Sequence, residues 1–331
     1  MMDGSLIKAD AALNSMVEKN EAGEPSEQMP PKYIKGNRYS NDTHVSYSDP
    51  DSTLAGKVGE PKQLRYKVHT TIDRESRIII DPHVTTGADV EGKTCMGRLD
   101  HIEETFGVKV DELTADRGYG YGINLHQLEE RGITTFIPNF HQDVGDKIDS
   151  ELFEFNPEKD MFTCPMGFPM ERRTSDKAES ENYMRRYQVK GTTCTQCPMN
   201  SKCFATPPQP GTRKMLSRNI YWQIQARVKK READPDFQKV RGERQWKAEG
   251  IFAEGKNYHG LGRARYRGRA KMQIQAYMIS FVQNLKRLVE LCPEFSVLVP
   301  VIFEQIWKKL SAQNNLSEKP ARVFLSAVKT A

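Results

Sequence analysis

The stretch Leu-Arg-Tyr-Lys-Val-His-Thr-Thr-Ile-Asp, residues 64–73, decides the fold class because its apolar and polar side chains alternate. This period of two is typical of a β-strand with one buried face. Three consecutive isoleucines follow at 78–80, and the polar residues 73–76 between the two segments indicate a turn. We therefore predict a β-hairpin whose second strand is bounded by Asp81-Pro82.

Helical and extended patterns alternate after this hairpin. A helix ending at Gly107 is predicted from apolar residues at helical spacing, namely Cys95, Leu99, Ile102 and Phe106. Strands are predicted at 108–115 and 133–138, with a helix at 122–131 between them. A further strand begins near Asp3. The pattern predicts an α/β fold with a mixed sheet flanked by helices.

Composition and charge restrict the class of protein. The chain has 331 residues, of which 37% are hydrophobic and 28% charged, as expected for a globular protein. Its longest apolar run, 295–303, is far shorter than the roughly 20 residues of a membrane helix. The N-terminus lacks the basic and apolar stretches of a secretory signal. We expect a cytoplasmic protein without a membrane span.

Positive charge is concentrated in the C-terminal half. Residues 206–290 contain 19 Lys and Arg against 7 Asp and Glu, which gives this segment a net charge of +12. The whole chain has a net charge of +5, so the remaining residues together carry +5 − 12 = −7. Such a basic region is typical of a nucleic-acid surface, since phosphate contacts supply most non-specific affinity for DNA. The alternative is a solvated helix face that offsets acidic neighbours.

Two carboxylates stand where functional groups are common. Asp116 directly follows a predicted strand, at the end where open α/β sheets place ligands; the alternative is a turn residue or a partner of Arg117. Glu249 lies on a helix predicted over 235–257, with Trp246 and Phe252 nearby as anchors. The alternative for Glu249 is a solvated helix glutamate.

Several motifs together resemble the DDE transposases of bacterial insertion sequences. They are Asp-Gly-Ser-Leu-Ile-Lys-Ala-Asp-Ala at 3–11, Arg-Tyr-Lys-Val-His at 65–69, Ala-Asp-Arg-Gly-Tyr at 115–119, Ala-Glu-Gly-Ile-Phe-Ala-Glu-Gly-Lys-Asn-Tyr-His-Gly-Leu at 248–261 and Arg-Ala-Arg-Tyr-Arg-Gly at 263–268. The resemblance spans roughly residues 1 to 290. It implies a ribonuclease-H-like core with catalytic Asp3, Asp116 and Glu249. These would hold two Mg²⁺ or Mn²⁺ ions during cleavage and strand transfer.

The resemblance also implies partners and an expectation about the N-terminus. DNA, as transposon ends and target, is the expected partner, with a homodimer on DNA and a place at the nucleoid. The helical DNA-end-binding domain that normally precedes the core is not seen before Asp3, so we expect an N-terminally truncated transposase. A shortened first strand would hold Asp3 loosely, and Asp10 is a substitute ligand to consider.

The expected organisation has four segments. Residues 1–140 form the first part of the core, with 18–61 as a long polar loop; 141–215 form a cysteine-bearing insertion; 216–291 are the helical part with Glu249; and 292–331 form a helical tail. The insertion contains Cys164, Cys194, Cys197 and Cys203. Four cysteines in a cytoplasmic protein predict a structural zinc site, with buried, redox-silent cysteines as the alternative.

The basic segment just beyond Glu249 is the predicted DNA contact. Its members are Lys256, Arg263, Arg265, Arg267, Arg269 and Lys271. The following helix has an apolar seam, which we expect to pack on the core, with dimerisation as the alternative: Ile274, Met278, Phe281, Leu285 and Leu288.

Two other functions remain compatible with these residues. A catalytically silent DNA-binding remnant would bind DNA in a salt-sensitive way without cleaving it. A hydrolase of RNA–DNA hybrids would share the core fold, because fold does not settle function.

Overall fold

The computed structural model describes residues 1–26, 39–57, 59–139, 148, 152–173, 184–292 and 305. Its fold is mixed α/β, and the described part contains several sheets and six α-helices. The chain divides into two compact units, Met1–Asp89 with Gln245–Ala331, and Val90–Arg244. Among the helices described, none has the length and apolar character needed to cross a bilayer.

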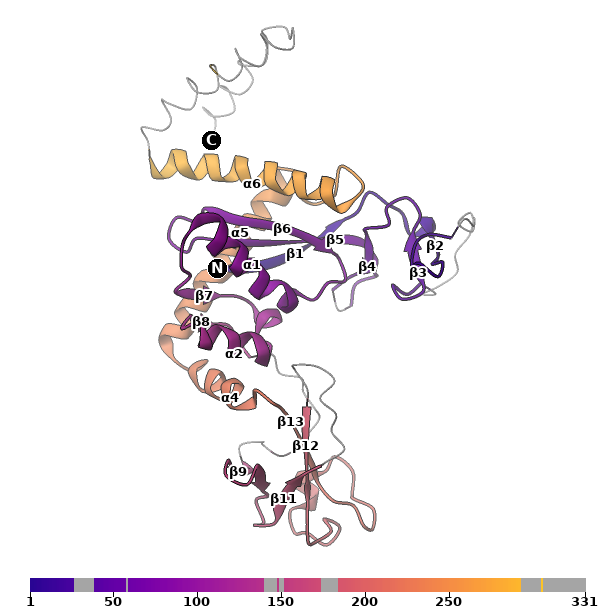
Figure 1. Cartoon of the computed structure of the whole chain (residues 1–331), viewed down its shortest axis with the longest axis vertical. Coiled ribbons are helices and arrows are strands. Elements are labelled where there is room, and N and C mark those ends of the chain that lie inside the picture. Colours follow the sequence, from indigo (N-terminus) through magenta and orange to yellow (C-terminus); the bar gives the residue numbers. More distant parts are fainter. Residues whose placement is uncertain are drawn as a thin grey trace. The chain divides into compact units, whose positions relative to one another are not determined.

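A four-stranded antiparallel sheet forms the first unit (Figure 1). Strand β5 (Gln63–Ile72) pairs with β1 (Met2–Lys8), β6 (Ile79–Thr86) and β4 (Thr53–Ala55). The predicted hairpin is therefore confirmed, but its second strand does not end at Asp81-Pro82. Pro82 lies inside β6 opposite Thr70. Proline is tolerated there because β6 is an edge strand, whose outward positions need no ladder N–H.

The described parts of residues 18–61, predicted as a long polar loop, contain short strands between connecting segments. A 3₁₀ turn, η1 (Leu13–Ser15), precedes β2 (Met16–Glu18), which pairs with β3 (His44–Ser46), and β4 follows. The Asn41 side chain accepts from Leu54 N–H at 2.8 Å and donates to Leu54 O at 2.9 Å. The turn-forming residues thus make hydrogen bonds within the protein. Composition alone does not distinguish such a segment from a solvated loop. Residues 27–38 of this segment lie outside the description.

Two long helices belong to this unit, α5 (Pro235–Tyr258), which starts in the second unit, and α6 (Arg269–Leu291). Helix α6 runs along the sheet in Figure 1, and its side chains form hydrogen bonds with the backbone at the edge of β6. Gln273 accepts from Val84 N–H and donates to Pro82 O, and Asn284 bonds both backbone groups of Ile79. These amides satisfy an otherwise open sheet edge.

Three of the five residues of the predicted apolar seam of α6 face away from the core, while Leu285 and Leu288 are half-buried. Ile274, Met278 and Phe281 are each about 60% exposed, while the buried face contains Met272, Gln275, Ala276, Ile279, Ser280 and Gln283. Polar residues occupy the inner face because they bond backbone groups, as Gln283 does with Ile251 O. The hydrophobic periodicity of this segment therefore predicted the wrong buried face of α6.

Helices and a parallel strand pair begin the second unit. Helix α1 (Glu91–Phe106) ends at Gly107 in a left-handed conformation, as predicted. Strand β7 (Glu112–Thr114), the 3₁₀ turn η2 (Arg117–Tyr119), helix α2 (Gly122–Glu130) and strand β8 (Thr134–Phe136) follow, and β7 and β8 are parallel. The predicted strands are confirmed but shorter, because only three residues of each form the ladder.

An antiparallel five-stranded sheet forms the rest of this unit, together with α3 (Asn200–Cys203) and α4 (Trp222–Arg231). Its strands are β9 (Glu154–Asn156), β10 (Met161–Thr163), β11 (Pro169–Arg172), β12 (Met184–Val189) and β13 (Met215–Asn219). The last strand extends past residue 215, where the cysteine-bearing insertion was expected to end. Phe162, Met170, Tyr187 and Leu216 form the centre of its own buried cluster.

Candidate functional site

Asp3 is the second residue of strand β1. It pairs with Thr70 across the β1–β5 ladder, and its residue is 7% exposed. Its Oδ1 accepts from Gly4 N–H at 2.9 Å. Seven residues of β1 pair with β5, so the expectation of a loosely held Asp3 is wrong: the ladder fixes the backbone on both sides of it.

Helix α5 lies along β1 in the same direction. Met1 shares a buried cluster with Ala248 and Ile251, Lys256 Nζ donates to Ser5 Oγ at 2.7 Å, and Lys8 forms a parallel bridge with Arg263. Because alternate residues of a strand share a face, Asp3 and Ser5 lie on one side of the sheet. Asp3 therefore lies on the face along which α5 runs.

Glu249 lies on the exposed side of α5. Its neighbour Ala248 is buried, whereas Glu249 itself is exposed. It lies between Ala248 and Ile251, which share the buried cluster of Met1, and precedes Lys256 by about two helical turns, so it falls within the stretch of α5 that runs beside the strand of Asp3. Sequence reasoning expected Trp246 as a buried anchor, but Trp246 is 55% exposed.

The β5–β6 turn supports the same stretch of helix. The Arg77 guanidinium lies over the Trp246 ring at 5.4 Å, and Lys247 Nζ donates to Arg74 O at 3.0 Å. A Cβ on Gly250 would lie 3.2 Å from an Arg77 nitrogen. Glu249 is thus flanked by residues that bind the turn, which fixes the rotation of the helix.

A network around Glu254 joins α5 to α6. Lys286 Nζ donates to Glu254 Oε1 at 2.9 Å, and Arg287 lies 3.4 Å from Oε2. Burial acts to raise the pKa of Glu254, but hydrogen bonds from Lys286 and His259 and the charges of Lys286 and Arg287 outweigh it and lower the pKa to about 2. This carboxylate is ionised and structural.

Asp116 belongs to the second unit and caps η2. It follows β7, is half-buried, and accepts from Gly118 N–H at 2.8 Å. A Cβ on Gly118 would lie 2.9 Å from Asp116 Oδ1 and 2.6 Å from Glu91 Oε2, so these oxygens are at most 5.5 Å apart. Glycine at 118 leaves room for two carboxylates. Sequence reasoning missed Glu91, whose only signal is its place in the first turn of α1.

The predicted DNA-binding arginines form an exposed stretch between α5 and α6. Arg263 and Arg267 both bind Asp10, with N–O distances of 3.0 and 3.6 Å. Arg265, Arg269 and Lys271 are also exposed, while Ala264, between Arg263 and Arg265, is buried. Asp10 is thus an ion-pair partner of the basic segment. A cleft of about 290 Å³ is lined by Asp10, Arg263 and Arg267.

Two acidic residues of the region predicted as loop anchor the end of this stretch. Asp49 is fully buried; its Oδ1 accepts from Tyr66 OH at 2.5 Å and from Gly268 N–H at 3.0 Å. Asp51 accepts from Arg269 N–H at 2.8 Å, at the start of α6. Burial raises the pKa of Asp49, partly offset by these hydrogen bonds. No periodic pattern reveals such anchors.

The four cysteines of the insertion line one cavity in the second unit. Burial raises the pKa of the Cys194 and Cys203 thiols. Neither therefore has the lowered pKa of a reactive thiolate. Throughout the described residues, no three or more His, Cys, Asp and Glu side chains are arranged to hold a metal ion.

Comparison with protein families identifies a match over part of the chain. Residues 163–289 match a family model described as "Transposase DDE domain". The matched region includes Glu249, the four cysteines and the basic segment, and it excludes Asp3 and Asp116. No curated protein and no solved structure matches the chain. The match supports a DDE-type transposase, a class that acts on DNA and generally uses divalent metal ions.

Proposed function

We propose that this chain is the catalytic domain of an insertion-sequence DDE transposase, which cleaves DNA at transposon ends and transfers the strand to target DNA. The observation that carries the proposal is the family match over 163–289, which contains Glu249 on a helix running beside the strand of Asp3. The basic segment directly after that helix supplies the DNA surface.

The pairing within each unit supports a ribonuclease-H-like core. The resemblance implies a first Asp on the first strand, a second after the fourth core strand, and a Glu on a later helix. Asp3 lies on β1, which belongs to an antiparallel set with β5 and β6; Asp116 follows β7, which is parallel to β8; and Glu249 lies on α5. These placements agree with the implied order.

The three proposed ligands have the right chemistry for Mg²⁺. Carboxylate oxygens are the hard ligands that Mg²⁺ or Mn²⁺ prefers, and Asp3, Asp116 and Glu249 all supply them. When bound, two such ions would polarise the phosphodiester and lower the pKa of an attacking water. Asp3 and Glu249 belong to one unit and Asp116 to the other.

The chain's own residues would bind and orient the DNA. The exposed guanidinium groups of Arg263, Arg265 and Arg267 would pair with backbone phosphates, for which the planar fork of arginine is suited. The anchors at Asp49 and Asp51 hold the backbone of this segment, so the side chains extend from a fixed base. Lys256 is bonded to Ser5 and would reach phosphate only by exchanging that partner.

A nicking assay on supercoiled DNA with Mg²⁺ or Mn²⁺ tests the proposal. Asp116→Asn and Glu249→Gln should each lower the nicking rate by at least about 100-fold while DNA affinity is retained, since they remove a ligand charge without changing shape. Glu104→Gln, at an exposed position of α1, is the matched control and should nick normally. Glu91→Gln reports whether the carboxylate beside Asp116 contributes.

Each outcome separates the proposed function from its alternatives. Unaltered nicking by Asp116→Asn or Glu249→Gln would contradict the assignment of these residues. Salt-sensitive binding without cleavage under any divalent ion would instead indicate a silent DNA-binding remnant. Cleavage confined to RNA–DNA hybrids would indicate a hybrid hydrolase. A DNA-bound dimer, if formed, is measured in the same samples by sedimentation.

A further inference from the structure

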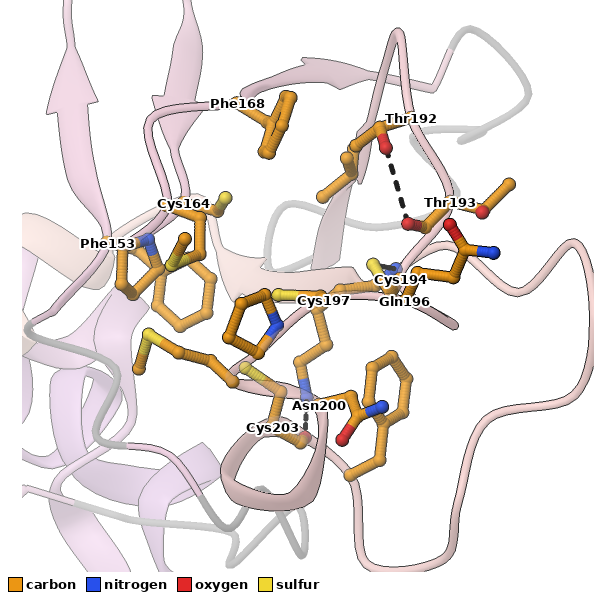
Figure 2. A pocket seen from close by; sticks show the side chains of 17 residues that line it. Phe153, Cys164, Phe168, Thr192, Thr193, Cys194, Gln196, Cys197, Asn200 and Cys203 are labelled. Atoms are coloured by element: carbon orange, nitrogen blue, oxygen red, sulfur yellow. Dashed lines mark hydrogen bonds between the residues drawn. The ribbon is translucent and has the colours of Figure 1, made fainter.

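The cysteines of the second unit surround a single cavity of about 350 Å³ (Figure 2). They come from the β10–β11 turn, the loop before α3, and α3 itself; they are Cys164, Cys194, Cys197 and Cys203. All four are free thiols. The other two cysteines lie elsewhere, Cys95 buried in α1 and Cys292 exposed after α6. Thiols separated by up to 39 positions thus face one space.

Tight backbone turns present these sulfurs. Gly167, with φ +80°, closes a turn in which its N–H donates to Cys164 O at 2.8 Å and Cys164 N–H donates to Phe168 O at 2.9 Å. Cys197 N–H donates to Cys194 O at 3.3 Å in a second turn. These backbone hydrogen bonds fix the chain at the positions from which the cysteine side chains project toward the cavity.

Hydrogen-bond donors and a buried cation lie beside the sulfurs. Lys214 N–H donates to Cys194 Sγ at 3.1 Å. Its side chain turns back so that Nζ donates to Cys203 O at 2.9 Å, and the residue is only 7% exposed. Burying an ammonium is costly unless negative charge lies near it. Four thiolates around a dication have a net charge of −2, which Lys214 would partly neutralise.

We propose that Cys164, Cys194, Cys197 and Cys203 bind one structural Zn²⁺ ion. Binding converts four thiols and Zn²⁺ into a tetrahedral tetrathiolate complex and releases four protons to solvent. The thiols already line the cavity but are not arranged at ligand distances in the described residues, so zinc binding would draw them closer together. All four ligands belong to one unit, and the site is separate from the proposed catalytic carboxylates.

The site would cross-link the small five-stranded sheet. Cys164 lies on the hairpin of β10 and β11, whereas Cys194 and Cys197 lie in the connection from β12 to β13. A shared metal joins these two parts of the sheet at one end. Small domains with limited cores commonly need such a cross-link, and the buried cluster of this sheet has fewer members than that of the first unit's sheet.

Metal analysis of the untagged full chain tests the proposal. Protein purified under reducing conditions with added Zn²⁺ and then desalted should contain about one zinc per chain by mass spectrometry. Co²⁺ in place of zinc should give the thiolate charge-transfer and tetrahedral d–d absorption bands. Cys197→Ser should lose most of the metal, while Cys292→Ser, the matched control outside the cluster, should keep it. Lys214→Met should weaken zinc affinity by about 10-fold or more.

Several results would overturn the assignment. Less than about a tenth of a zinc ion per wild-type chain, or cobalt spectra without thiolate bands, would do so even if a cysteine variant failed to fold. Equal metal loss from Cys292→Ser and Cys197→Ser would also do so. Asp116→Asn and Glu249→Gln should keep full zinc content, so failure of the zinc site and failure of the proposed catalytic site are distinguishable.

Discussion

In the first unit, the proposed functional groups are held by partners distant in sequence, whereas the cysteines of the second unit lie within 39 positions of one another. Lys256 bonds Ser5 across 251 positions, and Arg263 bonds Asp10 across 253. A sheet covered by long helices makes these contacts possible. The cysteine cavity instead depends on turns and on a small sheet.

This contrast indicates what each region needs in order to be ordered. The first unit has a large buried cluster that includes Ile7, Tyr66 and Phe252, so its carboxylates are positioned by packing. The second unit's sheet has its own smaller cluster around Phe162. We infer that the first region is ordered without metal and that the second depends on its proposed zinc. The types of ligand agree with this inference. The carboxylate oxygens suit a loosely held Mg²⁺ ion, and the cysteine sulfurs suit a permanently bound Zn²⁺ ion.

Paired core truncations should give the largest effect. Phe252→Ala and Phe162→Ala each remove a buried ring and should each cost about 3–5 kcal/mol locally. With zinc bound, hydrogen exchange should show that Phe162→Ala keeps protection in β10–β12, whereas Phe252→Ala loses it in β1 and β5 with or without zinc. A chelator should remove the difference.

Equal loss of protection in β10–β12 of Phe162→Ala with zinc and with chelator would break the comparison. It would show that the second unit, like the first, is held by its core alone. Wild-type protein with chelator is the control, because it shows how much protection metal removal costs before any ring is removed.

Periodicity predicted the elements that depend on burial of one face. The hairpin built on residues 64–73 and helix α1 follow from apolar spacing, which packing enforces, and the predicted helices at α2 and α5 and the strand of Asp3 are also present. Glu249 was correctly placed on a helix, although its convergence with Asp3 and Asp116 stays a prediction. The four cysteines line one cavity, and zinc binding there stays a prediction.

Features made by hydrogen bonds between distant residues were not predictable in this way. Gln273 and Asn284 face inward on α6 because they bond the edge of β6, so the apolar seam lies outside. Asp49 appears in a polar, turn-rich stretch, yet it is buried by its bonds to Tyr66 and Gly268. Such partners lie 17 to 219 positions away and leave no local pattern.

Glu254→Gln should give an intermediate, pH-dependent effect confined to the first unit. The folded pKa of Glu254 is lowered to about 2, so its ionised form stabilises the fold above the ordinary pKa, and this stabilisation is lost as pH falls from 4.5 towards 2. We expect the variant to lose about 2 kcal/mol at neutral pH, after allowance for partial solvent screening. Urea unfolding at several pH values measures the difference.

The difference between variant and wild type should shrink below about pH 4.5 and become small near pH 2, where about half of the folded wild-type Glu254 side chains are protonated. Glu104→Gln, in the second unit, should change stability little at any pH. A deficit of Glu254→Gln that stayed constant down to pH 2 would show that packing, not the charges of Lys286 and Arg287, links α5 to α6.

The smallest effect concerns the basic segment, where two variants should act in opposite directions. Asp10→Asn removes a negative charge beside Arg263 and Arg267 and should tighten DNA binding by about 2- to 5-fold, since exposed ion pairs are worth up to about 1 kcal/mol. Arg263→Gln should weaken binding and lower the salt slope by about one. Fluorescence anisotropy at several salt concentrations measures both, with Lys93→Gln on α1 as the control.

Weaker binding by Asp10→Asn would show that this carboxylate positions the arginines for DNA. Equal effects of Arg263→Gln and Lys93→Gln would place the DNA surface outside the first unit's basic segment.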